Sequence, residues 1–138
     1  MADAPASEAK AWMVKAWRDL ETARRAATGE PPFYDIAVYH CQQQAAEKAV
    51  KAFLVHHGTP YEKTHDIEVL VDLACGIDSN FSKLADAADA LTPYATRFRY
   101  PNATFAVEPL PVEYNEAMQH AKSVYDFVLN LLPAVERP

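Results

Sequence analysis

The fold is decided by one stretch of the sequence, YHCQQQAAEKAVKAFL at residues 39–54. Its small and apolar residues recur at steps of three and four, which places them on one face of a helix. We extend this helix from about Phe33 to His57, because Gly58 is a common residue after a last helical turn and Pro60 prevents the helix from resuming. The predicted buried stripe consists of Val38, Cys41, Ala45, Ala49, Ala52 and Phe53.

The same helix carries a polar stripe on its opposite side. Its members fall within roughly 60° of one another on a helical wheel, and they are His40, Gln44, Glu47 and Lys51. Glu47 precedes Lys51 by four residues, the favourable order for an ion pair worth about 0.2–0.5 kcal/mol. Taken alone, this stripe is interpreted as the solvated face that a long helix in a bundle needs.

Helical spacing predicts a further element on each side of this helix. The first begins at Ser7, a suitable N-cap, and ends before Gly29. Its stripe is Ala9, Met13, Ala16, Leu20, Ala23 and Ala27, with Trp12 and Trp17 widening the face. The second is a short helix that follows the long one, capped by Thr64 and ended by Gly76. Its predicted buried residues are Ile67, Leu70, Val71 and Ala74.

Two more helices are predicted in the second half of the chain. One runs from about Phe81 to Ala95 and contains Pro93, which removes a backbone donor and kinks or breaks the helix near Thr92. The last begins near Pro111, a good first-turn residue, and stops before Pro133. The predicted stripes are Phe81, Leu84, Ala88, Leu91 and Ala95, then Tyr114, Ala117, Ala121, Val124, Val128 and Leu131.

Helical segments joined by short links predict an all-α fold, an antiparallel up-and-down bundle of four to five helices. A length of 138 residues suits one domain, and half of the residues are hydrophobic, enough for one core. Glycine is scarce at three residues, and the many alanines and other helix formers argue against a sandwich or barrel. We expect a flexible leader at residues 1–6, a single bundle at residues 7–132 and a frayed tail at residues 133–138.

Charge and cysteine content limit the classes of function. The net charge of −6 counts against broad nucleic-acid binding, although a local basic patch could still hold a nucleotide or an RNA end. Cys41 and Cys75 are expected to be reduced thiols, and Cys41 lies on the buried stripe. With no secretion signal and no apolar run near the ~18 residues of a membrane helix, the expected location is the cytoplasm, away from membranes.

The most informative local cluster is RFRYP at residues 97–101. Arginines near a helix C-terminus can simply complement the helix dipole, but Arg97 and Arg99 also suit the two oxygens of a phosphate, and Tyr100 could stack on a base. The sequence shows no glycine-rich phosphate loop, no cysteine pair at zinc spacing and no serine elbow. We therefore expect no metal and no cofactor.

Four blocks, in this order, resemble the HEPN domain family. They are WRDL at residues 17–20, the stretch at residues 39–54, THDI at residues 64–67, and RYP at residues 99–101. The resemblance covers roughly residues 12–130. It implies a helical bundle that commonly forms a homodimer and has a proposed nucleotide-binding role. Many such proteins are similar to toxin or antitoxin components that partner a small nucleotidyltransferase.

Some members of this family cleave RNA without metal, using an arginine followed after four to six residues by a histidine. In this sequence the corresponding positions hold Asn102, Ala103 and Thr104 after Arg97, and Thr104, Phe105 and Ala106 after Arg99. No histidine occurs between His65 and His120. Because this chemistry needs an acid/base group with a pKa near neutral, the sequence favours binding over catalysis.

Three hypotheses follow. The first is a non-catalytic module that binds a nucleotide or a nucleotidyltransferase-like partner through Lys48, Lys51, His65, Arg97, Arg99 and Tyr100. The second is an RNA-cleaving toxin in which Arg97 or Arg99 neutralises phosphate charge and His65 substitutes for the missing histidine. The third is an adaptor bundle that offers only a helix face to a protein partner.

Overall fold

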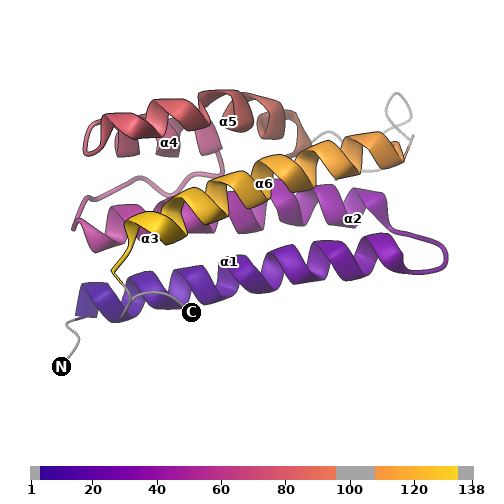
Figure 1. Cartoon of the computed structure of the whole chain (residues 1–138), viewed down its shortest axis with the longest axis horizontal. Coiled ribbons are helices and arrows are strands. Elements are labelled where there is room, and N and C mark those ends of the chain that lie inside the picture. Colours follow the sequence, from indigo (N-terminus) through magenta and orange to yellow (C-terminus); the bar gives the residue numbers. More distant parts are fainter. Residues whose placement is uncertain (1–3, 96–107, 134–138) are drawn as a thin grey trace.

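The computed structural model describes residues 4–95 and 108–133, and all of their regular secondary structure is helical. Four helical arms run alternately up and down the bundle (Figure 1). One outer arm is α1 (Ala4–Thr28), and the opposite outer arm contains α4 (Ile67–Cys75) and α5 (Ala85–Leu91). Between them lie the arm that ends in α3 (Glu47–His56) and the last helix, α6 (Pro111–Leu131). This arrangement confirms the predicted all-α, up-and-down bundle.

The first helix is longer than predicted. It already includes Ala4, so the start expected at Ser7 was three residues late, and Ser7 lies inside the helix rather than capping it. The helix ends at Thr28, just before Gly29, as predicted. Its buried stripe is confirmed at Ala9, Met13, Ala16 and Ala23, which are fully buried.

The second arm is continuous from Tyr34 to His56 but is not uniformly α-helical. It consists of α2 (Tyr34–Tyr39), a π-helical segment η1 (His40–Ala46) and α3. Spacing alone predicted the extent of the arm but not the π segment, in which hydrogen bonds join residues five apart. The predicted buried stripe is confirmed, since its six residues are at most 2 % exposed. Burial raises the pKa of the Cys41 thiol on this stripe to about 12.

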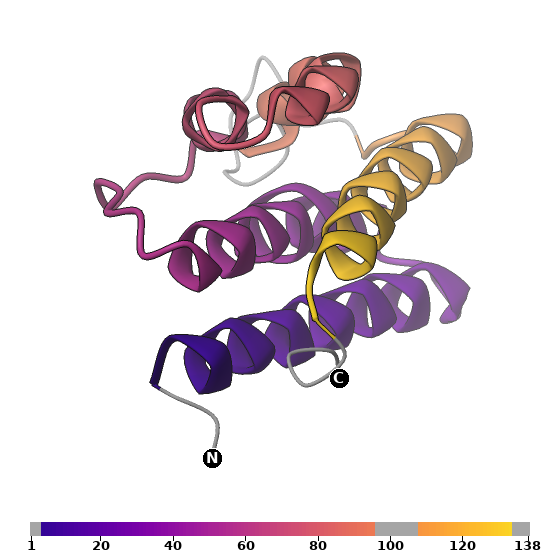
Figure 2. The ribbon, with the colours of Figure 1, turned by 60° about the vertical axis from the view of Figure 1, so that its left-hand side comes forward.

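The polar stripe on this arm was interpreted wrongly. Glu47 is only 3 % exposed and Lys51 only 7 %, so neither belongs to a solvated face. The reason is the position of α3, which packs against α1, α4 and α6 and lies in the middle of the bundle (Figure 2). A helix covered from several sides has no wet face, so its charged side chains must find partners inside the protein.

The arm formed by α4 and α5 has sharper breaks than the sequence indicated. Asp66, not Thr64, caps α4: its carboxylate accepts a hydrogen bond from the backbone N–H of Glu68 at 3.0 Å. The predicted fourth helix begins as a 3-10 helix, η2 (Ser79–Leu84), before α5. Pro93 breaks the helix rather than kinking it, because α5 ends at Leu91 and a 3-10 turn, η3 (Thr92–Ala95), follows.

The last helix starts at Pro111 and ends before Pro133, as predicted. Its stripe is confirmed at Ala117, Ala121, Val124 and Val128, but Leu131 is 38 % exposed and Leu132 is buried in its place. The backbone of Leu132 is extended, so the chain leaves the helix there and turns that side chain inward. Within the described ranges, every helix is too short or too polar to span a lipid bilayer.

Candidate functional site

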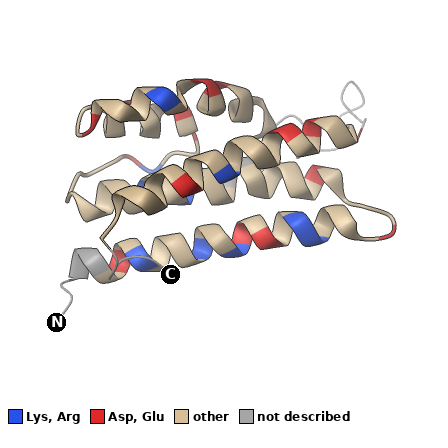
Figure 3. Ribbon diagram, in the orientation of Figure 1, with Lys and Arg blue, Asp and Glu red and all other residues tan. Residues whose placement is uncertain are grey.

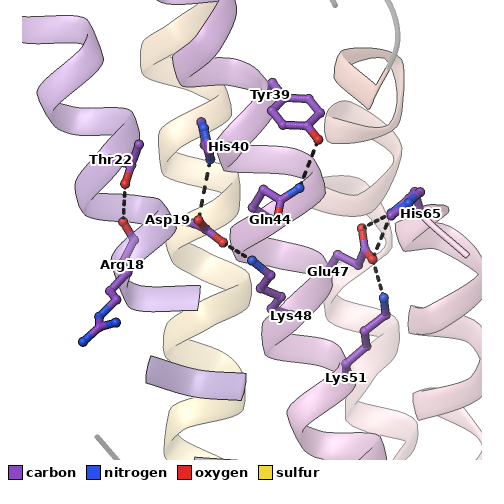
Figure 4. A network of polar contacts seen from close by, with 10 residues as sticks. All are labelled: Arg18, Asp19, Thr22, Tyr39, His40, Gln44, Glu47, Lys48, Lys51 and His65. Atoms are coloured by element: carbon purple, nitrogen blue, oxygen red, sulfur yellow. Dashed lines mark hydrogen bonds and ion pairs between the residues drawn. The ribbon is translucent and has the colours of Figure 1, made fainter. Parts of the chain in front are cut away.

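A cluster of charged side chains is centred on Glu47, at the start of α3. The carboxylate of Glu47 accepts a hydrogen bond from the ammonium of Lys51, one helical turn further on. The Nδ1 atom of His65 lies 3.1 Å and 3.2 Å from the two carboxylate oxygens (Figure 4). His65 comes from the segment before α4, and its side chain is 59 % exposed. One buried carboxylate therefore holds a buried cation and an exposed imidazole.

Two aromatic rings complete the surroundings of Lys51. Its ammonium lies 5.7 Å from the ring centre of Trp12 and 5.7 Å from that of Tyr61. A cation at this distance from a ring face is attracted by the π electrons. Burial, helped by the negative charges of Glu8 and Glu47, raises the pKa of Tyr61, so its hydroxyl stays protonated at neutral pH.

A second charged cluster lies beside the first, where α1 faces the second arm. The carboxylate of Asp19 accepts a hydrogen bond from Lys48 at 2.7 Å and lies 3.6 Å from Nδ1 of His40, an ion-pair distance (Figure 4). Burial raises the pKa of Asp19, but the contacts with His40 and Lys48 and the charge of Lys48 outweigh it and hold that pKa below its ordinary 3.8. The ionised carboxylate is thus stabilised in the folded protein.

The structure separates the lysines that the sequence grouped together. Lys48 turns towards α1 and Asp19, whereas Lys51 joins Glu47 and His65. The other candidates, Arg97, Arg99 and Tyr100, lie outside the described residues. In residues 4–95 and 108–133, no group of three or more His, Cys, Asp or Glu side chains could hold a metal ion.

The candidate residues predicted from the sequence did not include Asp19, Trp12 or Tyr61. They also did not include Glu47 and His40, which were named only as part of the polar stripe. Asp19 carried a usable signal, because it stands three residues after Ala16 and four before Ala23, on the apolar stripe of the first helix. A charge on a buried stripe requires a partner, and Lys48 is that partner. No comparable signal pointed to Tyr61, which lies in an irregular segment.

The Glu47 cluster combines an internally balanced ion pair with an exposed imidazole. Because the negative charge of Glu47 already balances Lys51, the pair contributes a fixed dipole rather than a free cation. The carboxylate of Glu47 orients the ring of His65, whose side chain is 59 % exposed. The imidazole is therefore the one member of this cluster that is both oriented and open to a ligand.

Comparison with known proteins identifies the family. A model of the HEPN domain matches residues 9–131. The chain belongs to the HEPN domain family. This HEPN chain is similar to TT1696 from Thermus thermophilus, with 26 % identity, a TM-score of 0.72 and coverage of 91 % of this chain and 99 % of that one.

A second solved structure with the same fold is ST0689, described as an archaeal HEPN homologue. It shares 27 % identity with this HEPN chain, and the TM-score is 0.71 over 90 % of this chain and 97 % of that one. No curated protein sequence matches. The resemblance inferred from the four sequence blocks is therefore confirmed, as is the HEPN type of helical bundle.

Proposed function

We propose that this protein is a non-catalytic HEPN module that binds a nucleotide at the Glu47 cluster. The observation that carries this proposal is the exposed imidazole of His65, oriented by the buried carboxylate of Glu47. The other partner of that carboxylate, Lys51, lies 5.7 Å from the ring centres of Trp12 and Tyr61. An imidazole N–H can donate a hydrogen bond to phosphate, and aromatic rings offer surfaces on which a base can stack. Arg97, Arg99 and Tyr100, outside the described residues, are the groups proposed to complete the site.

The two lysines have supporting roles in this proposal. Each is paired with a carboxylate that is at most 14 % exposed, Lys48 with Asp19 and Lys51 with Glu47. Their charges are thus largely used within the bundle, and they fix the helix that carries the site. For a phosphate, His65 offers a hydrogen-bond donor, and the two arginines are proposed to supply the positive charge.

Titration calorimetry with ATP, GTP and their monophosphates tests the nucleotide half of this proposal. We expect saturable binding by the wild type and a loss of about ten-fold or more in affinity for His65→Gln and for the double variant Arg97→Ala with Arg99→Ala. His120→Gln, on α6, is the matched control and should bind as the wild type does. Unchanged heats for all four ligands at millimolar concentration would remove nucleotide binding.

The family also supports a proposal about partners. We propose that the chain forms a homodimer and pairs with a small nucleotidyltransferase-like protein, as a component of a toxin–antitoxin system. Sedimentation equilibrium on the purified chain tests the homodimer, and a mass equal to one chain at all concentrations would contradict it. Co-purification with a small nucleotidyltransferase tests the second partner. If that partner binds but calorimetry detects no nucleotide binding, the protein acts as an adaptor.

The contact between Glu47 and His65 favours one second candidate, metal-independent RNA cleavage. A carboxylate that orients an imidazole also prepares it to act as an acid/base group. The test is an RNA cleavage assay without metal on the wild type, on His65→Ala and on the Arg97→Ala, Arg99→Ala double variant. Cleavage by the wild type alone would make the protein an enzyme, and no cleavage by any of them would support the binding module.

A further inference from the structure

A hollow between α1 and α6, separate from the Glu47 cluster, has the features of a small-molecule site. Its volume is about 380 Å³, within the range of about 300–1,000 Å³ that is common for ligand sites. The residues that line it recur at each helical turn along one face of α1 and one face of α6. The apolar lining comes from Trp17 and Leu20 on α1 and from Tyr114, Met118 and Tyr125 on α6.

Two of the aromatic side chains that line this hollow are fixed by packing, and the third is half exposed. The ring of Tyr114 packs against that of Tyr34 with centroids 5.5 Å apart, and Tyr125 is 7 % exposed. Trp17, by contrast, is 49 % exposed. A large indole left half uncovered beside two fixed phenol rings offers a face on which a planar apolar group can stack.

Charges of both signs surround the apolar lining in equal number. On α1, Glu21 and Arg24 form an ion pair at 2.8 Å. On α6, Lys122 and Asp126 also line the hollow, and among the described residues neither has an ion-pair partner. They stand four apart with the lysine first, the less favourable order for pairing along a helix. Figure 3 shows both signs of charge along these two helices.

We propose that this hollow binds a small zwitterion with an aromatic side chain, such as a free aromatic amino acid. Its ring would stack on Trp17, its carboxylate would face Lys122, and its ammonium would face Asp126. The balance of charge argues against a nucleotide here, because several phosphate charges would meet Asp126 and Glu21 as well as the two cations. This ligand class therefore differs from that proposed for the Glu47 cluster.

The test is a titration of 15N-labelled protein with L-phenylalanine, followed by NMR of the two tryptophan indole N–H signals. Trp17→Phe assigns the signals, since only Trp12 then remains. We expect a saturable shift of the Trp17 signal and a smaller one, or none, of the Trp12 signal. No movement of the Trp17 signal up to ~20 mM ligand would overturn the proposal, because even a millimolar site would be occupied at that concentration.

Two analogues and two variants test the role of each charge. Phenethylamine lacks the carboxylate and 3-phenylpropionate lacks the ammonium, and each should bind at least about ten-fold more weakly than phenylalanine. Lys122→Gln should reduce the affinity for phenylalanine to that for phenethylamine, and Asp126→Asn should reduce it to that for phenylpropionate. Lys83→Gln and Asp86→Asn, on the opposite arm, are the matched controls. Equal affinities for the three ligands, or unchanged binding by both α6 variants, would overturn the zwitterion assignment.

Discussion

A substitution should destabilise the protein most at Glu47, because its side chain contacts two partners and is almost completely buried. Its side chain and that of Lys51 are 3 % and 9 % exposed. Removing two charges from water is costly, and their attraction offsets the cost only while both are present. Substituting Glu47 alone therefore leaves the ammonium of Lys51 buried without its counter-charge.

We expect Glu47→Ala to lower the free energy of unfolding by about 3 kcal/mol, because Lys51 then remains charged inside the bundle. The double variant Glu47→Leu with Lys51→Met should recover most of that loss, since both charges are gone. Urea denaturation of the wild type and the variants measures these free energies of unfolding. Glu21→Ala, which breaks the exposed pair with Arg24, is the control and should have a smaller effect. Equal effects of Glu47→Ala and Glu21→Ala would mean that the buried pair is solvated.

Asp19 makes stability depend on pH. Its pKa is lower in the folded protein than the ordinary 3.8, so folding favours the ionised form. That contribution is fully present above the unfolded pKa and is lost as the pH falls through the folded one. The melting temperature of the wild type should therefore fall more steeply than that of Asp19→Asn as the pH is lowered below about 4. The exposed control Asp86→Asn should give a curve of melting temperature against pH that is parallel to that of the wild type. A parallel curve for Asp19→Asn would contradict this role.

At the scale of helices, alanines set how closely α3 approaches its neighbours. Ala49 is fully buried, and α3 packs against α1 and α6. Ala49→Leu should therefore lower the free energy of unfolding by about 1–3 kcal/mol, because a larger side chain forces the helices apart. Ala90→Leu, at an exposed position of α5, is the matched control and should leave thermal denaturation nearly unchanged. An unchanged melting midpoint for Ala49→Leu would show that this position is not tightly packed in solution.

The same helices show what spacing can and cannot predict. The apolar stripes were predictable because residues such as Val38, Cys41 and Ala45 repeat with the helical period, whatever lies outside the helix. The polar stripe was not, because the burial of Lys51 depends on how other segments, including those that carry Trp12 and Tyr61, pack around it. Likewise Lys51 and His65 were named as candidates, but their shared carboxylate became evident only from the packing.

At the scale of the whole molecule, one apolar core includes residues from every α-helix. It joins Met13 on α1, Phe53 on α3, Leu70 on α4, Leu91 on α5 and Val124 on α6. Such a core predicts cooperative unfolding in one transition. Tryptophan fluorescence, which reports only on α1, and far-ultraviolet circular dichroism, which reports on all helices, should give the same urea midpoint. Two separate midpoints would mean that α1 leaves the bundle independently.

The π-helical segment at His40–Ala46 has a consequence for insertions and deletions in the gene. In an α-helix each residue turns the chain by about 100°, so losing one codon rotates everything that follows. A π turn holds an extra residue, and a deletion there can convert it to an α turn while α3 keeps its orientation. Loss of a codon between Glu47 and Lys51 has no such reserve and rotates Lys51 away from its carboxylate. Loss of one residue should therefore be tolerated within residues 40–46 and disruptive between Glu47 and Lys51.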